Sequence, residues 1–388
     1  MDTSPIHILF VSDHLGHEGG RIHGATRYFL DVLPQLEKSA AVELHVVFLR
    51  RYHKMAQLLE EQGVEVTFLQ RAKYDPRAVL DIVQRIRNDQ IAILHCAGMK
   101  GILSGRIAAR ITGIPCIAHL HDMLPPPVPI RQMMRLTRHW SELTLAISNA
   151  VAQFAAAYFK TPPATISVLR NGVHLSPFCV PTSPAKRLKL RKQLGIPEDA
   201  TVIISVGRLH AVKGFSDSIN VLRHIRNPKI WLLIVGEGPE EKHLREQAQG
   251  LPVVFAGQRS DIPDLLTLAA VMLMPSYSEG LGLSAMESLA AGVPVVAYAT
   301  GGLKEVVVHN TCGILVPKGD LTALCEATRE LIFDKEKNQQ FACEARRRSA
   351  SFAIDQHIEK LLDLYRNIFR AFCDTRSANT DAKHKQET

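Results

Sequence analysis

The stretch "SEGLGLSAMESLAAGVPV" (278–295) places two glutamates, Glu279 and Glu287, around a glycine turn that leads into an apolar helical pattern. A strand-like run, "VMLMPS" (271–276), comes directly before it. Strand, glycine turn and helix in immediate succession are typical of one crossover in a parallel α/β sheet. A purely structural turn needs the glycines but not the two acids, so we expect this crossover to carry function as well as fold.

The same alternation of apolar runs and helical patterns extends over the whole chain. In the first half the runs are "IHILFVS", "VELHVVFL", "VEVTFL", "IAILHCA", "CIAHLH", "LTLAIS" and "TISVLRN", and in the second half "TVIISVG", "WLLIVG", "VVFAG", "VMLMPS", "VPVVAY" and "GILVP". Two such series predict two doubly wound α/β domains with parallel sheets. A proline-rich segment (176–189) marks the join. We therefore expect an N-terminal domain over 1–178, a C-terminal domain over 179–355, a helix over 356–373 that packs back on the N-terminal domain, and a disordered tail over 374–388.

Length and composition agree with two soluble domains. The 388 residues exceed the usual size of one hydrophobic core, and 46% hydrophobic with 22% charged residues is ordinary for a globular protein. No apolar run reaches membrane-spanning length, and the first residues lack the basic start of a signal peptide. The seven cysteines are scattered and odd in number, which favours a reducing compartment. We expect a cytoplasmic protein.

The net charge of +8 is unevenly distributed. Residues 1–180 carry 19 Lys/Arg against 14 Asp/Glu, and "KRLKLRK" (186–192) adds five basic residues. This balance favours anionic small molecules or an anionic membrane surface over nucleic acid. A solvated helix face is the alternative interpretation of "KRLKLRK".

Two basic residues follow the first strand of the second series. "ISVGRLHAVKG" (204–214) reads as a strand, a turn at Gly207, and then Arg208 and Lys213. A guanidinium and an ammonium at a strand end suit a diphosphate. The stretch is neither a dinucleotide G-x-G-x-x-G nor a P-loop pattern, so an NAD enzyme is disfavoured.

The opening stretch also suits an anion. Ser284 and Glu287 fit the S-x-x-E capping box of a helix, whose free N–H groups would attract negative charge. Glu279 would reach the same place from the other side of the turn. Two acids beside a phosphate make sense if they bind hydroxyl groups attached to it. Glu287 has an alternative, since a capping carboxylate needs no ligand.

With these motifs together, the sequence resembles the retaining family-four glycosyltransferases (glycosyl transferases group 1). The E-x7-E pair within "PSYSEGLGLSAMESLAAGVPVVA" is the most specific part, followed by "TGGLKEVV" and "GILVPKGD". "RNGVHL", "SVGRLHAVKG" and "GQRSDIPDLL" stand in the family's order. The resemblance covers nearly the whole chain. It implies the GT-B fold, in which two Rossmann-like domains face each other across a cleft.

The resemblance implies roles for residues of the C-terminal half. Arg208 and Lys213 would bind the donor diphosphate, and Glu287 would bind the ribose hydroxyls. Glu279 would contact the transferred sugar, and Arg259 would lie against the base. The donor-binding residues so implied are Gly207, Arg208, Lys213, Arg259, Glu279, Gly280, Leu281, Gly282, Leu283, Ser284 and Glu287. The catalytic residues so implied are Glu279, His121, Arg208 and Lys213.

The N-terminal half matches the family at two further points. "HLHD" (119–122) matches the strand-end histidine, which we assign to His121, although His119 alternates onto the same strand face. Each could instead be a hydrogen-bonded core histidine. "SNAV" (148–151) resembles the helix start on the cleft side, and Ser148 could equally be only an N-cap.

The loop after the first strand departs from the family, because it is stretched to residues 12–33. Either "EGG" or "HGA" could be the equivalent point, so the acceptor-side candidates are Gly19, Gly20, His23 and Gly24. Helical periodicity from Ala25 favours Gly24 as the last loop residue. A metal site built from His14, His17 and His23 is disfavoured by their irregular spacing.

The resulting expectation is a retaining hexosyltransferase. It would move a hexose or N-acetylhexosamine from a nucleoside-diphosphate sugar, with a UDP-sugar favoured and GDP-mannose next, to a glycan or lipid-linked acceptor in cell-envelope, lipopolysaccharide or exopolysaccharide synthesis. No metal or other cofactor is expected, because the chain contains no D-x-D. Peripheral contact with the inner face of a membrane is an option. The alternatives are a nucleotide-sugar epimerase and a non-catalytic nucleotide-sugar-binding subunit.

Overall fold

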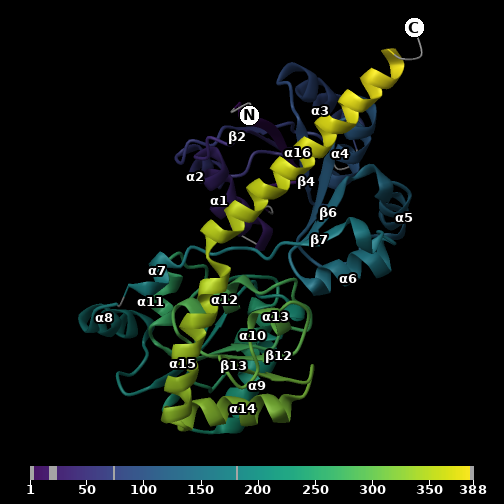
Figure 1. Ribbon diagram of the computed structural model, residues 1–388. Helices are drawn as coiled ribbons and strands as arrows, with labels where there is room; N and C mark the ends of the chain where they lie inside the picture. Colours follow the sequence, from purple (N-terminus) through teal and green to yellow (C-terminus); the bar gives the residue numbers. More distant parts are fainter. Residues whose placement is uncertain (1–3, 17–23, 73–74, 181, 385–388) are drawn as a thin grey trace. The chain divides into compact units, whose positions relative to one another are not determined.

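The computed structural model describes residues 4–16, 24–72, 75–180 and 182–384 (Figure 1). It divides into two compact units, one of Met1–Gly172 with Ile354–Thr388 and the other of Val173–Ala353. Each unit is a parallel sheet with interleaved helices, so the expected class of two doubly wound α/β domains is confirmed. The changes of unit, after Gly172 and Ala353, lie close to the expected boundaries at 178 and 355.

The first unit contains a seven-stranded sheet in the order β3-β2-β1-β4-β5-β6-β7. Its elements are β1 (Ile6–Ser12), α1 (Gly24–Glu37), β2 (Val42–Phe48), α2 (Ala56–Glu60), β3 (Val66–Phe68), α3 (Arg77–Asn88), β4 (Ile93–Ala97), α4 (Met99–Thr112), β5 (Cys116–Leu120), α5 (Val128–Leu136), η1 (Arg138–Trp140), β6 (Leu143–Ala146), α6 (Asn149–Tyr158), η2 (Pro163–Thr165), β7 (Ile166–Val168) and α16 (Ile354–His384). The central strands are apolar along their length because helices cover both faces of the sheet. Five of the seven residues in β1 are buried in succession, for example.

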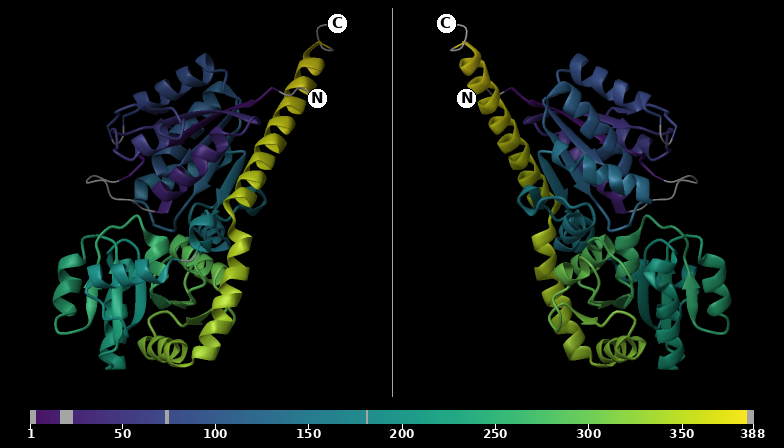
Figure 2. Two further views of the ribbon diagram at one scale, coloured as in Figure 1. Left: turned by 90° about the vertical axis from the view of Figure 1, so that its left-hand side faces the viewer. Right: turned by 90° about the vertical axis from the view of Figure 1, so that its right-hand side faces the viewer.

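Helix α16 brings the C-terminal segment back to the first unit. Leu361 and Tyr365 of this helix are fully buried in the core with residues of α1 and β1. Figure 2 shows α16 running alongside the elements of this unit in both views. The helix continues to His384, which corrects the expected disordered tail from residue 374. The segment 374–384 contains no glycine or proline, so nothing in it interrupts a helix that already exists.

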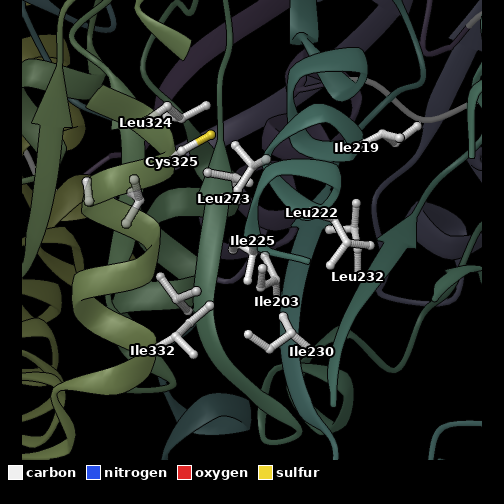
Figure 3. Packing of buried hydrophobic residues seen from close by; sticks show 14 of the residues in the cluster. Ile203, Ile219, Leu222, Ile225, Ile230, Leu232, Leu273, Leu324, Cys325 and Ile332 are labelled. Atoms are coloured by element: carbon white, nitrogen blue, oxygen red, sulfur yellow. The ribbon is translucent and has the colours of Figure 1, made fainter. Parts of the chain in front are cut away.

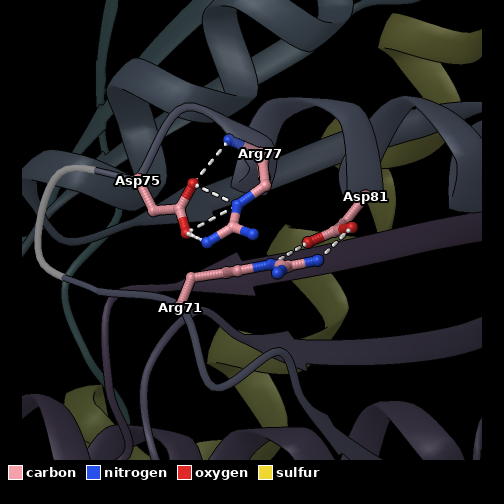
Figure 4. A network of polar contacts seen from close by, with 4 residues as sticks. All are labelled: Arg71, Asp75, Arg77 and Asp81. Atoms are coloured by element: carbon pink, nitrogen blue, oxygen red, sulfur yellow. Dashed lines mark hydrogen bonds and ion pairs between the residues drawn. The ribbon is translucent and has the colours of Figure 1, made fainter.

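Local ion pairs hold the connection between β3 and α3. Arg71 forms a two-pronged pair with Asp81 of α3, at 2.6 and 2.9 Å. Asp75 accepts hydrogen bonds from the backbone N–H and the guanidinium of Arg77 at the start of the helix (Figure 4). The Arg71–Asp81 pair ties the segment after β3 to α3 and therefore supports the position of this helix.

The second unit contains a six-stranded sheet in the order β10-β9-β8-β11-β12-β13. Its elements are α7 (Ser176–Cys179), α8 (Pro184–Leu194), β8 (Thr201–Val206), η3 (Ala211–Lys213), α9 (Phe215–Ile225), β9 (Ile230–Val235), α10 (Glu241–Gln247), β10 (Val253–Phe255), α11 (Ile262–Leu266), β11 (Ala269–Met274), α12 (Leu283–Ala290), β12 (Val295–Tyr298), α13 (Leu303–Val306), β13 (Gly313–Val316), α14 (Leu321–Phe333), α15 (Lys335–Ser349) and η4 (Ala350–Phe352).

Helices cover both faces of this sheet as well. Ile203 and Leu273 of the central strands pack with residues of α9 and α14 in one core (Figure 3). Met272 and Val295 alternate onto the opposite face and are also fully buried, where α12 contacts β11 and β12. Burial of both faces fixes the register of the strands and, with it, the positions of the loops at their carboxyl ends.

Candidate functional site

The strand order of the second unit has a switch point between β8 and β11. From β8 the chain progresses outward to β9 and β10, and from β11 it progresses the other way to β12 and β13. In open parallel sheets, ligands bind beyond the carboxyl ends of the strands at such a point. Arg208 and Lys213 follow β8, and residues 278–287 follow β11. Both predicted clusters therefore leave the sheet at its switch point.

The loop after β8 presents two cationic side chains. Arg208 is half-buried, and its Nε atom is shielded from solvent without a hydrogen-bond partner among the described residues. Lys213 ends the short helix η3 and is followed by Gly214, which has a φ of +68°. A Cβ atom at Gly214 would stand 2.0 Å from the carbonyl oxygen of Pro275, so only glycine lets the two loops meet.

The two loops are joined by an ion pair. Lys213 Nζ donates to Glu279 Oε2 at 2.6 Å, and the two side chains are 27% and 11% exposed. The backbone N–H of Tyr277 also donates to the carbonyl of Val212 at 2.7 Å. The structure thus brings together one residue expected to bind the diphosphate and one expected to bind the sugar. A ligand with a diphosphate and a sugar could separate this ion pair, with the diphosphate bound to Lys213 and a sugar hydroxyl bound to Glu279.

Helix α12 begins differently from the prediction. Its N-cap is Gly282, with a φ of +100°, and among the described residues no side chain caps the helix. Ser284 is therefore already inside the helix and Glu287 lies in its second turn, so the predicted capping box is wrong. A left-handed backbone at Gly282 turns the chain into the helix without a capping side chain. The first N–H groups of α12 are left for an anion, and Glu287 is not needed as a cap.

The segment after β10 is also organised by an ion pair. Arg259 binds Asp261 through two hydrogen bonds of 2.8 and 2.6 Å, and this guanidinium lowers the pKa of the Asp261 carboxyl. The backbone N–H of Gln258 donates to Glu237 Oε1 at 3.4 Å, which links the loops after β9 and β10. With its guanidinium held by Asp261, Arg259 offers a ligand a flat, fixed surface.

Sequence reasoning missed a carboxylate with two tyrosines near the same loops. Asp217, in the first turn of α9, accepts hydrogen bonds from Tyr277 at 2.7 Å and Tyr298 at 2.9 Å. Burial and the hydrogen bond to Asp217 raise the pKa of Tyr298, so it remains protonated and keeps donating. The three residues tie α9 to the ends of β11 and β12. No local pattern marks them, because 60 or more positions separate Asp217 from either tyrosine.

In the first unit, both candidate histidines belong to a buried aromatic cluster. His119 is fully buried and its Nδ1 lies 3.0 Å from His95 Nε2, while His95 Nδ1 lies 2.6 Å from the Tyr365 hydroxyl of α16. His119 is therefore a core histidine. Tyr28 of α1 packs against the ring of His121 at 4.7 Å and its hydroxyl lies 3.1 Å from His357 Nε2.

His121 differs from His119 in its hydrogen bonding. It directly follows β5 and is half-buried, and neither of its ring nitrogens has a partner among the described residues. Burial lowers the pKa of His121 to about 3, so its imidazole is neutral at physiological pH. A neutral ring at a strand end can exchange hydrogen bonds with a hydroxyl group of a ligand.

The remaining candidates of the first unit have mixed outcomes. Ser148 is the N-cap of α6 and accepts from the backbone N–H of Val151 at 3.1 Å, as the simpler interpretation expected. Gly24 is the first residue of α1 rather than the last loop residue. Gly19, Gly20, His17 and His23 lie outside the described residues, so the acceptor-side loop stays a prediction.

Asp13 is a further residue that sequence reasoning did not select. It follows β1, and its carboxylate accepts the backbone N–H of Gly101 in the first turn of α4. Burial raises the pKa of this carboxyl. Asp13 thereby fixes the loop at the switch point of the first sheet, between β1 and β4.

Within the part of the chain that the structure describes, no helix is both long and apolar enough to cross a membrane.

Comparison with known families finds a match in each unit. Residues 186–348 match the model described as "Glycosyl transferases group 1", and residues 22–177 match the model described as "Glycosyltransferase Family 4". The first covers the loops with Arg208, Lys213, Glu279 and Glu287, and the second covers His121.

Curated relatives and solved structures agree with these matches. The chain is 31% identical to a D-inositol 3-phosphate glycosyltransferase from Xylanimonas cellulosilytica, over 68% of each protein. It is 26% identical to the UDP-Gal:alpha-D-GlcNAc-diphosphoundecaprenol alpha-1,3-galactosyltransferase of Escherichia coli, over 75% of this chain and 79% of the relative. Across the curated relatives compared, the alignments span 47% to 79% of the relatives' own length.

Among solved structures, the Anabaena protein Alr3699/HepE in complex with UDP superposes with a TM-score of 0.80 at 24% identity, covering 93% of this chain and 100% of that one. At that identity, the superposition shows that the fold is shared.

Proposed function

Because the chain belongs to the group 1 glycosyl transferases of family four and has their GT-B fold, we propose that it is a retaining hexosyltransferase that uses a nucleoside-diphosphate sugar. The observation that carries this proposal is the Lys213–Glu279 pair at the switch point of the second sheet. It unites a phosphate-binding cation and a hydroxyl-binding carboxylate at the place where a sugar diphosphate needs both.

In this proposal, the donor diphosphate replaces Glu279 as the partner of Lys213. Arg208 contributes the second charge through a guanidinium whose Nε has no other partner among the described residues. The first N–H groups of α12, at Leu283 and Ser284, hold the distal phosphate. Glu279, released from Lys213, binds hydroxyls of the sugar, and Glu287 binds those of the ribose.

This arrangement supports transfer with retention of configuration. The cations stabilise the negative charge that develops on the leaving diphosphate as the glycosidic C–O bond breaks. The acceptor hydroxyl then attacks the same face of the oxocarbenium-like sugar, and a phosphate oxygen of the leaving group takes its proton. Both acids belong to the donor side, Glu279 in the loop after β11 and Glu287 in α12, so neither serves as the base that an inverting reaction needs behind the sugar. His121, as a neutral imidazole, would hydrogen-bond a substrate hydroxyl.

We also propose that this transfer needs no metal ion. The sequence contains no D-x-D, and Arg208, Lys213 and the α12 N-terminus supply positive charge at the site. A UDP-sugar is the favoured donor, with GDP-mannose next, because the related galactosyltransferase is named for UDP-Gal and the Anabaena protein was solved with UDP.

A lipid-linked acceptor in cell-envelope or exopolysaccharide synthesis, met at the inner face of the membrane, is the favoured acceptor class. The name of the related enzyme includes a diphosphoundecaprenol, and α5 exposes Val128, Met133 and Leu136 beside Arg131 and Arg135. Contact between this helix and anionic lipid predicts salt-sensitive binding to anionic vesicles. Equal binding to neutral and anionic vesicles at low salt would contradict it.

The experiment for the proposed activity is a hydrolysis screen of nucleotide sugars with the purified protein, monitored by release of the nucleoside diphosphate. The proposal expects hydrolysis of one donor class, strongest for a UDP-sugar, and its loss in Arg208→Ala/Lys213→Ala. Conversion of the sugar to its epimer with the diphosphate bond intact would instead support an epimerase.

A further inference from the structure

Two histidines and a glutamate meet at the amino ends of the first two strands. His7 is the second residue of β1, and Glu43 and His45 are the second and fourth residues of the seven-residue β2. The parallel register pairs His7 with Glu43, and His45 is two residues further along β2, so it shares a sheet face with Glu43. From His7 to Ser12 the strand advances roughly 16 Å, so this cluster lies far from the ligand-binding end of its own sheet.

The separations of the side-chain atoms suit a small divalent metal. His7 Nε2 is 3.6 Å from Glu43 Oε2, and His45 Nε2 is 3.5 Å from Glu43 Oε1. One ligand atom from each of the three residues lies within 4.8 Å of the others. Zinc–ligand bonds of about 2.0–2.1 Å in a tetrahedron place neighbouring ligand atoms roughly 3.3–3.4 Å apart. The cluster thus needs only a small adjustment to close around the ion.

Asp89, the C-cap of α3, lies beside both rings. His7 Nδ1 lies 3.2 Å from the carbonyl oxygen of Asp89, and His45 Nδ1 lies 3.8 Å from its Oδ2. Each Nδ1 therefore faces an acceptor, which favours a proton on Nδ1 and leaves the Nε2 lone pair toward Glu43. This is the arrangement in which metal-binding histidines are held by an outer carbonyl or carboxylate. The Asp89 carboxylate is shared with Arg85 at 3.4 Å, so it supports the ligands rather than joining them.

A second observation points to a ligand between these residues. The Nε2 atom of His45 is shielded from solvent and makes no hydrogen bond within the described residues. Glu43 Oε1, at 3.5 Å, is too far for a good hydrogen bond, and a shielded ring nitrogen without a hydrogen bond costs free energy that a metal bond would recover. The charge of Glu37 interacts with those of Glu43 and Glu65, so the surroundings of the cluster are acidic and favour a cation.

We propose that His7, Glu43 and His45 form a zinc-binding site, with Asp89 as the positioning residue. Two imidazoles and one carboxylate are ligands that zinc prefers, and water completes the tetrahedron. The ion would link β1 to β2 and, through Asp89, to the end of α3. The cluster lies toward the amino ends of β1 and β2, away from the ligand-binding end of this sheet, so the ion would take no part in glycosyl transfer.

The test measures zinc bound to the untagged full chain by equilibrium dialysis and elemental analysis. Cys179, Cys343 and Cys373 are replaced by serine throughout, because these exposed thiols also bind zinc. We expect one zinc equivalent in this parent protein and its loss in His7→Gln/His45→Gln. Glu43→Gln, which changes the charge with little change of shape, is expected to lose it as well. The matched control is His224→Gln on the surface of α9, which should keep it.

A graded variant separates positioning from general disruption. Asp89→Asn leaves all three ligands in place and should weaken zinc binding about 10–100-fold, as outer partners do in other zinc sites. Zinc should also raise the melting temperature of the parent but not that of Glu43→Gln, with circular dichroism confirming that each variant is folded. The proposal is overturned if the folded His7→Gln/His45→Gln or Glu43→Gln variant binds as much zinc as the parent, or if the parent binds none.

Discussion

Replacing Glu279 with glutamine should separate sugar transfer from nucleotide binding. The change keeps the shape of the side chain but removes the charge that now pairs with Lys213 Nζ at 2.6 Å. If the carboxylate is released to bind the sugar when the donor arrives, its loss removes a contact with the transferred sugar and slows the transfer. The diphosphate keeps both of its cations, Arg208 and Lys213.

The size of each effect follows from the geometry of the pair. A hydrogen bond to a charged partner contributes about 1.5–3 kcal/mol, and one between less charged groups about 0.5–1.5 kcal/mol. Glu279→Gln should therefore lower the free energy of unfolding by about 1–1.5 kcal/mol. The affinity for the nucleoside diphosphate should stay the same or rise by less than about 10-fold, because Lys213 no longer has a competing carboxylate. Loss of a contact made in the transition state should reduce kcat about 10²–10³-fold.

Isothermal titration with the nucleoside diphosphate and steady-state transfer kinetics measure the two effects separately. The matched control is Glu330→Gln, which breaks another Lys–Glu pair of the same unit, with Lys337 on α15, away from the proposed site. It should leave both quantities unchanged. A fall in nucleotide affinity as large as the fall in kcat would show that Glu279 binds the nucleotide, and a kcat within a few fold of the parent would refute its assignment to the sugar.

Three other outcomes are expected. Arg208→Ala/Lys213→Ala should abolish turnover and weaken nucleoside diphosphate binding by more than about 100-fold, since each charged contact contributes about 1.5–3 kcal/mol. Unchanged affinity in calorimetry would reject both assignments. Transfer should continue after dialysis against a chelator, and complete loss that manganese or magnesium restores would contradict metal-independent chemistry. Burial lowers the pKa of His95 and His121 to about 3 and that of His357 to about 4, so these rings bind protons in the unfolded chain before they do in the folded one. The contribution of these neutral rings to the free energy of unfolding is complete above the ordinary histidine pKa of about 6.5. It should be lost as pH falls from there toward 3–4, by up to about 1.4 kcal/mol per pH unit for each ring. A urea midpoint of unfolding that stays constant from about pH 7.5 to 5 would contradict this prediction.

The sequence was most informative about the strands and the loops that follow them. Strands such as "TVIISVG" are buried on both faces of the sheet. Burial on both faces requires consecutive apolar residues, and the sequence shows these directly. The loops after β8 and β11 could be predicted because their glycines and charged residues interrupt the regular alternation of strands and helices.

Features that depend on distant segments could not be predicted in this way. The Lys213–Glu279 pair joins residues 66 positions apart, and the His95–Tyr365 contact requires α16 to return across 270 positions. The capping box failed for a local reason, because the left-handed Gly282 is the N-cap, so that α12 begins at Leu283 and Ser284 already lies inside the helix. The pairing of His7 with Glu43 depends on the register of β1 against β2, which the sequence does not state.

The most direct test of the proposed mechanism is proton NMR of the first product formed from an α-linked nucleotide sugar. In the proposed mechanism, the cations around the leaving diphosphate, with both acids on the donor side, favour attack on the face from which the diphosphate departs. The account predicts an α-linked product, identified by the coupling constant of its anomeric proton before any later isomerisation. A β-linked first product would mean that a base on the opposite side activates the acceptor, and it would contradict the mechanism.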